Sequence, residues 1–223
     1  MDKGYTIKYV QNPPQWESIE QWRSIPFVWI DNFHPEGSDH KPVTIVRVIY
    51  NQSGLYGLFE VKDTYVVCRY RGFQEPVWKD SCVEFFVQPN IEKGYFNFEF
   101  NCGGAMLCSW VKDYRISDGK FRNSQRLTAD DVKGMEVFHT LPSKIEPEIQ
   151  GLTEWQLGFH IPFTVFKTYI GELGEIGGMN WRGNFYKCAD ESSHPHWASW
   201  SPVKELNFHM PDCFGTLRFE EQS

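Results

Sequence analysis

Apolar and polar residues alternate over short runs from residue 43 onward, a pattern typical of β-strands with one buried face. Val43–Tyr50 and Leu55–Val61 are rich in β-branched and aromatic residues, and Asn-Gln-Ser-Gly separates them at 51–54. Because these polar residues favour chain reversal, the two runs predict a hairpin.

Further strand-like runs follow at short intervals. Ser81–Val87, Tyr95–Asn101 and Ala105–Val111 predict a three-stranded meander, because Pro-Asn and Gly-Gly pairs separate them. Later candidates are Met135–Leu141, Trp155–Ile161, Gly183–Ala189 and Gly215–Glu220. Strands do not alternate with helices, which argues against a parallel sheet. The pattern predicts an all-β fold, an antiparallel β-sandwich.

Two segments predict short helices and two others predict irregular structure. The helices are expected around Glu17–Trp22 and at Phe163–Ile170, where Pro162 ends the preceding strand. Residues 1–42, rich in Pro and Trp, predict an N-terminal extension packed on the sandwich. Residues 112–134 are polar and predict a long loop of the kind that often carries binding residues. We therefore expect a single domain over residues 1–223.

Aromatic residues make up 17% of the chain, with 9 Trp, 10 Tyr and 18 Phe. Most of these rings are expected in the core, which a chain of this length can build by burying about 70% of its unfolded surface. A few can serve as flat surfaces on which a ligand stacks.

Charge and hydropathy exclude several classes of partner. The formal net charge is −7 and Lys and Arg are not clustered, so nucleic acid and anionic membranes are poor partners. The sequence lacks an apolar run of ~18 residues and predicts no membrane insertion. Met1–Gln11 resembles no signal peptide, which indicates the cytoplasm, or secretion if a leader was removed.

The six cysteines predict reduced, buried thiols. They form no C-x-x-C motif, and several lie inside apolar runs, where a free thiol behaves as a small hydrophobic side chain.

Four segments, in order along the chain, carry motifs of a known family. Residues 43–63 form an opening hairpin, and EPVWKDSCVEFFVQP at 75–89 contains W-x-x-D-S-x-E-x-F. EWQLGFHIPF at 154–163 precedes the closing segments WRGNFYKCAD, ASWSPV and NFHMPDCFGTLRF, which span 181–219. Over about residues 26–220 the chain thus resembles the family 9 carbohydrate-binding modules.

This resemblance implies a fold, a function and a metal. The fold is a DOMON-like β-sandwich. The function is non-catalytic binding of oligo- or polysaccharides, such as the ends of xylan- or glucan-type chains, in association with glycoside hydrolases. The metal is structural calcium. Asp31, Asp39, Asp63 and Asp190 are the hard-oxygen candidates for it, although their spacing alone does not suggest calcium.

The resemblance also implies a sugar slot between two aromatic walls. Trp78 falls on the first wall, Phe208 on the second, and Glu84 on a carboxylate that hydrogen-bonds the sugar. Amide positions fall on Asn184 and near Asn207.

One position departs from the family pattern. Glu99 lies near the place of a sugar-binding Arg. Glu accepts hydrogen bonds whereas Arg only donates them, so the identity of the ligand does not transfer unchanged.

Histidines near these positions are further candidates. His209, beside Phe208, could donate to a sugar hydroxyl. His194 and His196 form an H-P-H triplet near Cys188. Alternate residues can share a metal, but the chain offers no second tight pair of ligands, so a loop lining the slot, with His196 in contact with the ligand, is favoured over zinc.

The physics of such a slot requires hydrogen bonds as well as rings. Burying ~100 Å² of apolar area contributes about 2.5 kcal/mol. A dissociation constant of about 1 mM needs about 4 kcal/mol before ordering costs. Carboxyl and amide groups must therefore supply the remainder.

Two other functions compete with binding. A haem or electron-transfer domain would need axial ligands such as Met106, Met179 or Met210 with a His, but no C-x-x-C-H motif is present and no haem is expected. A glycosidase needs two carboxylates about 5–9 Å apart. Asp80 and Glu84 are four residues apart, which on a strand is ~13 Å. We therefore assign no catalytic residue.

Overall fold

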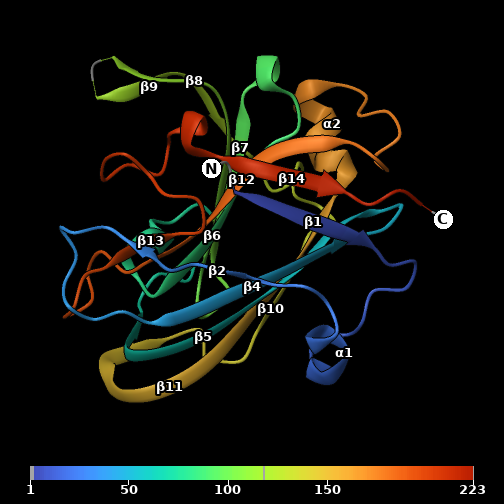
Figure 1. The fold of residues 1–223 in the computed structure, drawn as a ribbon. Coiled ribbons are helices and arrows are strands. Elements are labelled where there is room, and N and C mark those ends of the chain that lie inside the picture. Colours follow the sequence, from blue (N-terminus) through green and yellow to red (C-terminus); the bar gives the residue numbers. More distant parts are fainter. Residues whose placement is uncertain (1–2, 118, 223) are drawn as a thin grey trace.

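The structure is a computed structural model that describes residues 3–117 and 119–222, where the chain forms a β-sandwich with two short helices (Figure 1). The strands are β1 Gly4–Tyr9, β2 Val28–Trp29, β3 Asn32–Phe33, β4 Val43–Tyr50, β5 Gly54–Cys68, β6 Cys82–Gln88, β7 Tyr95–Asn101, β8 Met106–Ser117, β9 Lys120–Arg126, β10 Glu136–His139, β11 Ile145–Pro162, β12 Asn180–Cys188, β13 Trp197–Ser199 and β14 Gly215–Phe219. The helices are α1 Ile19–Arg23 and α2 Phe163–Ile170, and 3₁₀ turns lie at η1 Val77–Lys79, η2 Ile91–Lys93 and η3 Pro211–Cys213.

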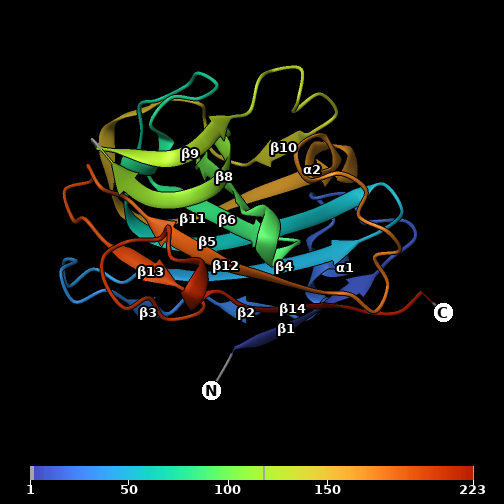
Figure 2. The same ribbon diagram turned by 90° about the horizontal axis from the view of Figure 1, so that it is seen from above.

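The strands follow one continuous hydrogen-bonded path, β10-β11-β5-β4-β1-β14-β12-β6-β7-β8-β9. Folding of this path places β10, β11, β5 and β4 in one layer and β14, β12, β6, β7, β8 and β9 in the other, and Figure 2 shows the two layers from above. The sequence prediction of an all-β sandwich with one or two short helices is confirmed. Pairing is antiparallel except at the two neighbours of β1.

Strand β1 joins the two layers. Its first residues pair in parallel with β14, and Lys8 and Tyr9 pair in parallel with β4. Tyr5 Oη accepts a hydrogen bond from Val48 N at 2.8 Å and donates to Pro26 O at 2.7 Å. The N-terminal residues are therefore built into both sheets, whereas the sequence suggested an extension laid on them. The alternation in β1 lies within the Pro- and Trp-rich segment at residues 1–42, which predicted irregular structure.

Phenylalanine rings fill the space between the layers. Successive side chains of a strand point to opposite faces, so β6 turns Val83, Phe85 and Val87 inward. The Phe85 ring stacks on Phe159 of β11 at 5.7 Å between centroids and on Phe185 of β12 at 4.9 Å. Many of the other aromatic residues are buried in the same core.

The predicted loop at 112–134 is partly wrong. Strand β8 continues to Ser117 and pairs with β9, forming a hairpin that projects from the sandwich (Figure 1). Its side chains are mostly exposed. A strand that is polar on both faces shows no alternation of apolar and polar residues, so the sequence pattern did not predict β9.

The N-terminal segment covers the outer face of the β4–β5 layer. Trp22 of α1 is fully buried there against Ile49 and Leu58, and the Trp16 ring stacks on Phe138. Of the helices, α1 matches its predicted place to within two residues and α2 matches it fully. In the part of the chain that the structure describes, α1 and α2 are the α-helices, and the 3₁₀ turn η1 lies against β6 and β7 of the other layer.

Substitution of Ile7 tests the role of β1. Ile7 is fully buried in the core between the layers, so Ile7→Ala should lower the free energy of unfolding by about 2–5 kcal/mol. The neighbouring exposed residue provides the control, and Thr6→Ala should change it by no more than about 0.5 kcal/mol. Urea unfolding measures both. Equal small effects would show that β1 does not join the layers in solution.

Candidate functional site

The outer face of β6, β7 and β12 carries a row of buried polar side chains. Alternation points Glu84 of β6 away from the core, and its cross-strand partners are Glu99 on β7 and Tyr186 on β12. Glu84 and Glu99 are 2% and 5% exposed. Two carboxyl groups thus lie side by side under a cover on this face.

Two half-buried aromatic rings provide part of that cover. Trp78, in the 3₁₀ turn η1, and Phe208, in the loop before η3, pack against the same small apolar cluster, which contains Cys82, Leu107 and Cys188. The Phe208 ring also stacks on Tyr186, with centroids 4.0 Å apart and an interplanar angle of 12°. We call the region made by Trp78, Phe208, Glu84, Asn97 and Glu99 the ring-flanked patch.

The polar groups of the patch are incompletely satisfied. Asn97 Nδ2 donates to Glu99 Oε1 at 2.6 Å. Glu99 Oε2 and Asn97 Oδ1 are buried without a protein partner. Buried acceptors are normally hydrogen-bonded, so these two atoms have capacity for a donor such as a hydroxyl group.

Burial sets the protonation of the two acids. It raises the pKa of Glu99 to about 7, against the opposing hydrogen bond from Asn97. It raises the pKa of Glu84 well above its usual range, with further contributions from Cys188 and Glu99. A protonated carboxyl can donate as well as accept. The patch can therefore donate a hydrogen bond to a hydroxyl group or accept one from it.

Asn184, a predicted sugar contact, is engaged elsewhere. Its Oδ1 accepts from Ser201 N at 2.8 Å and its Nδ2 donates to Ser201 O at 2.8 Å. The side chain is fully buried. It ties β12 to the loop after β13.

Asn207 and His209 shape the loop that carries Phe208. Asn207 Oδ1 accepts from His209 N at 2.9 Å, and His209 Nδ1 lies 2.7 Å from Tyr95 Oη. Burial lowers the pKa of His209 to about 4, so its ring is neutral near neutrality. Both residues border the patch and hold its second ring in place.

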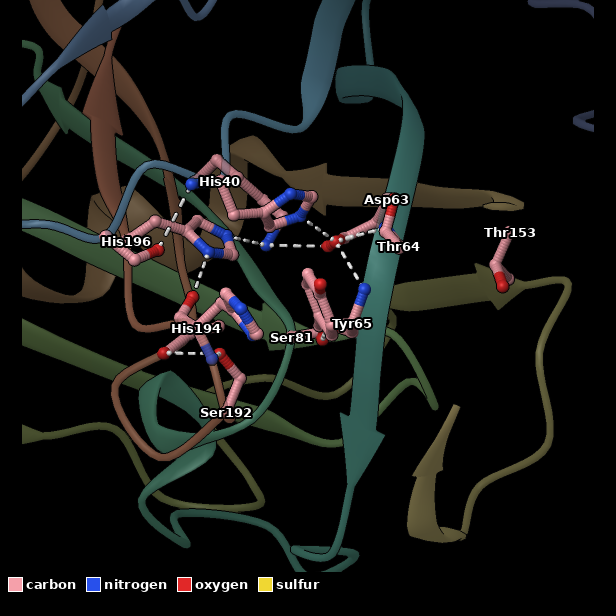
Figure 3. A network of polar contacts seen from close by, with 12 residues as sticks. His40, Asp63, Thr64, Tyr65, Ser81, Thr153, Ser192, His194 and His196 are labelled. Carbon is pink, nitrogen blue, oxygen red and sulfur yellow. Dashed lines mark hydrogen bonds and ion pairs between the residues drawn. The ribbon is translucent and has the colours of Figure 1, made fainter. Parts of the chain in front are cut away.

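His196 lies in a different place, in a polar network between the layers (Figure 3). His196 Nε2 is 2.7 Å from Lys187 Nζ, which lies 3.3 Å from Asp63 Oδ2. Asp63 Oδ1 is 2.7 Å from His40 Nε2. Because Lys187 projects from β12 and Asp63 from β5, this ion pair bridges the two sheets.

The charges in this network are set by one another. Burial raises the pKa of Asp63, but the Lys187 ammonium and the His40 hydrogen bond outweigh it and hold that pKa below its usual value. Burial and the Lys187 charge lower the pKa of His196 to about 3. His196 is thus a neutral acceptor for Lys187, while its Nδ1 faces His194 O at 2.9 Å.

The sequence carries a signal for the burial of Lys187. Trp181, Phe185 and Lys187 fall on one face of β12 by simple alternation. A lysine in phase with core aromatics predicts a buried ammonium, and a buried ammonium requires a buried carboxylate nearby. The identity of that partner, Asp63, depends on sheet packing.

The described residues contain one compact group of three or more metal-ligating side chains, Cys82, Glu84 and Cys188. The predicted calcium ligands do not form such a group. Asp63 is engaged with Lys187 and His40, and Asp190 Oδ1 accepts from Trp197 Nε1 at 2.7 Å.

An open groove of about 580 Å³ is lined by residues that include Phe33 and Val203, and Val203 packs on the same apolar cluster as Phe208. Lys41 Nζ lies 5.9 Å from the centroid of the Phe33 ring. A cation therefore lies near the face of this aromatic ring.

Comparison with protein families decides the relationship of the chain. The model of carbohydrate-binding family 9 matches residues 16–219. The chain belongs to carbohydrate-binding family 9. The resemblance seen in the sequence motifs is thereby confirmed.

Solved structures agree with this membership. A presumed carbohydrate-binding protein from Bacteroides uniformis ATCC 8492 is 29% identical with a TM-score of 0.84, and the match covers 99% of this chain and 100% of that one. A family 9 module from Caldicellulosiruptor kristjanssonii matches in its glucose complex (11% identity, TM-score 0.66, 99% and 97% coverage) and in its cellotriose complex (12%, 0.66, 99% and 95%). No curated protein matches this family 9 chain.

Two other sequence expectations can be compared with this family 9 structure. All six cysteines are free, as predicted, and all six are buried. Among the described residues no helix is both long and apolar enough to cross a membrane.

The low pKa of His196 predicts a pH-dependent stability. In the unfolded chain this imidazole titrates near 6.5, and in the folded chain near 3. Between these values only the unfolded chain binds the proton. The free energy of unfolding should therefore fall on acidification, by up to about 1.4 kcal/mol per pH unit from this group.

Comparison with His196→Gln isolates this contribution from that of Glu84 and Glu99, which has the opposite sign. Gln can accept from Lys187 but does not titrate. Urea unfolding between pH 6.5 and 4 should show the wild type losing stability relative to the variant. Parallel pH profiles would contradict the assigned neutral imidazole.

Proposed function

We propose that this chain binds an oligo- or polysaccharide, without altering it, at the ring-flanked patch. Membership of carbohydrate-binding family 9 supports carbohydrate binding as the function. The location is supported by one observation: two half-buried rings border a floor of carboxyl and amide groups that includes two unpartnered acceptors.

The patch offers both kinds of contact that a sugar requires. Trp78 and Phe208 can cover apolar C–H faces, and Glu84, Asn97 and Glu99 can pair with hydroxyl groups. The carboxyl groups of Glu84 and Glu99 are almost fully covered in the free protein. Binding therefore requires the rings of Trp78 and Phe208 to move apart. The loops that carry them, rather than the strands beneath, are the elements that can move.

Glucan and xylan chain ends are the ligands we propose to test first. The similar Caldicellulosiruptor module was solved with glucose and with cellotriose. Glu99 in place of a sugar-binding Arg supplies an acceptor where the family has a donor. We therefore expect a preference that differs from that of members with the Arg.

Alanine substitution of the rings tests the location. Trp78→Ala and Phe208→Ala should each weaken saccharide binding by about fivefold to thirtyfold, because each loses about 1–2 kcal/mol of ring contact. The matched control is Trp29→Ala, since Trp29 is exposed on the outer face of the other layer. Calorimetry with the best ligand from a glycan array measures all four proteins.

Glu84→Gln tests the polar floor with little change in volume. It should also weaken binding at least tenfold. Either oxygen of the carboxyl group can accept a hydrogen bond from a hydroxyl group, whereas the amide nitrogen that replaces one of them can only donate. Unchanged affinity in Trp78→Ala, Phe208→Ala and Glu84→Gln would place the saccharide elsewhere. Absence of binding by the folded wild type to every glycan would contradict the function itself.

A glycosidase is the second candidate, and one observation favours it. Glu84 and Glu99 are cross-strand partners, and such positions place side chains about 5 Å apart, near the separation in retaining glycosidases. The pair suggested by the sequence is unsuitable, because Asp80 Oδ2 accepts from Arg69 N, Tyr70 N and Asn101 Nδ2.

Product analysis distinguishes the two candidates. A binding domain should leave every saccharide it binds intact over prolonged incubation at millimolar concentration. Release of shorter sugars that stops in both Glu84→Gln and Glu99→Gln would establish hydrolysis and overturn the non-catalytic assignment.

A structural calcium ion stays a prediction from the family resemblance. Calcium prefers six to eight oxygen ligands, and among the described residues no three carboxylates converge. The donors of the one compact group, which include two sulfurs, do not fit calcium.

A further inference from the structure

Cys82, Glu84 and Cys188 form a chelating arrangement at the base of the ring-flanked patch. Cys82 and Glu84 are two residues apart on β6 and share its outer face, and Cys188 on β12 is the register partner of Cys82. Their ligand atoms all lie within 4.8 Å of one another, with Cys188 Sγ 3.1 Å from Glu84 Oε1. Tetrahedral Zn²⁺ needs such donors about 3.6–3.8 Å apart.

The group is buried, and its own hydrogen bonding is weak. The bond to Glu84 within it comes from the Cys188 thiol, which is a poor donor. The ammonium of Lys187, the preceding residue on β12, projects from the opposite face of the strand and contacts Asp63 and His196. Such a burial of an acid beside two thiols is costly unless a stronger partner is bound.

A second observation points to a missing ligand. Glu99, the cross-strand neighbour of Glu84, keeps Oε2 buried and unpartnered. A cation held by the three side chains would also lower the free energy cost of burying the Glu99 carboxylate, because an opposite charge nearby favours the ionised form.

We propose that Cys82, Glu84 and Cys188 bind a soft divalent cation of the zinc class. Two thiolates select such a metal over calcium or magnesium, which prefer oxygen ligands. Binding displaces the protons of the two thiols and, where it is protonated, of the carboxyl group. Three protein ligands leave a fourth position for water or for an oxygen of a bound molecule.

Sequence spacing could not reveal this site. The cysteines are 106 positions apart and neither belongs to a C-x-x-C motif. Only the antiparallel pairing of β6 with β12 brings them together. The proposal does not depend on saccharide binding, because metal uptake is measured on the protein alone.

Metal titration of the reduced wild-type chain is the test. One Zn²⁺ per chain should remain after dialysis, and zinc should raise Tm whereas calcium and magnesium should not. With CoCl₂ as the probe, thiolate-to-cobalt charge-transfer absorption should appear in the near ultraviolet and saturate at one equivalent. Failure of the folded wild type to take up zinc or cobalt would overturn the proposal.

Variants assign the ligands. Cys82→Ser and Cys188→Ser should each lose the cobalt absorption, and Glu84→Gln should weaken metal affinity at least tenfold. Cys108→Ser is the matched control, because Cys108 is equally buried but lies outside the group, and it should bind like the wild type.

Thiol protection covers the case in which the serine variants do not fold. Bound zinc should protect Cys82 and Cys188 of the wild type from alkylation, as read by peptide mass spectrometry. Protection of other cysteines instead, or undiminished cobalt absorption in the serine variants, would overturn the assignment. Saccharide binding by metal-free protein, measured in parallel, keeps the two proposals separate.

Discussion

The alternation of side chains along β6, β7 and β12 is the constraint on which the site depends. One phase places Phe85, Phe98 and Phe185 between the layers, where they form the core. The other phase necessarily turns Glu84 and Glu99 to the outer face. Because a shift of one residue would expose the core rings, the positions of the acids are fixed by the burial of the phenylalanines.

A polar connection between the layers complements this core. The ion pair of Lys187 with Asp63, supported by His40 and the neutral His196, crosses the sandwich next to the patch. Replacement of a buried pair by apolar residues is often tolerated, but loss of one partner leaves an uncompensated charge. Lys187 and Cys188 are neighbours on β12. The ion pair of Lys187 with Asp63 orients the inner face of this strand, and it therefore also positions the Cys188 side chain on the outer face.

Much of the fold could be predicted from the sequence. Strands with one apolar face, such as β4 and β7, were found at or near their bounds, and α2 was found in full. Two elements were missed for different reasons: β9 is polar on both faces, whereas β1 alternates but lies within the Pro- and Trp-rich segment that predicted an extension. Which strands become neighbours depends on packing between distant segments, and this is why the bridging role of β1 was not foreseen.

The candidate site was predicted less completely. Trp78 and Phe208 pack on one apolar cluster, and Glu84 contacts Cys188 of that cluster, but the role of these residues in binding stays a prediction. Asn184 and His196 could not be placed from motifs, because their partners, Ser201 and Lys187, are determined by tertiary contacts. Cys82 and Cys188 were read only as hydrophobic side chains, since their proximity arises from strand pairing.

The most direct measurement of the central claim is the response of the tryptophan indole N–H signals in a ¹H–¹⁵N spectrum during titration with cellotriose or another bound saccharide. We expect the Trp78 signal to shift with saturation while that of Trp29, on the opposite outer face, stays in place. A saturating shift of Trp29 or of signals near Phe33, with Trp78 unchanged, would contradict it.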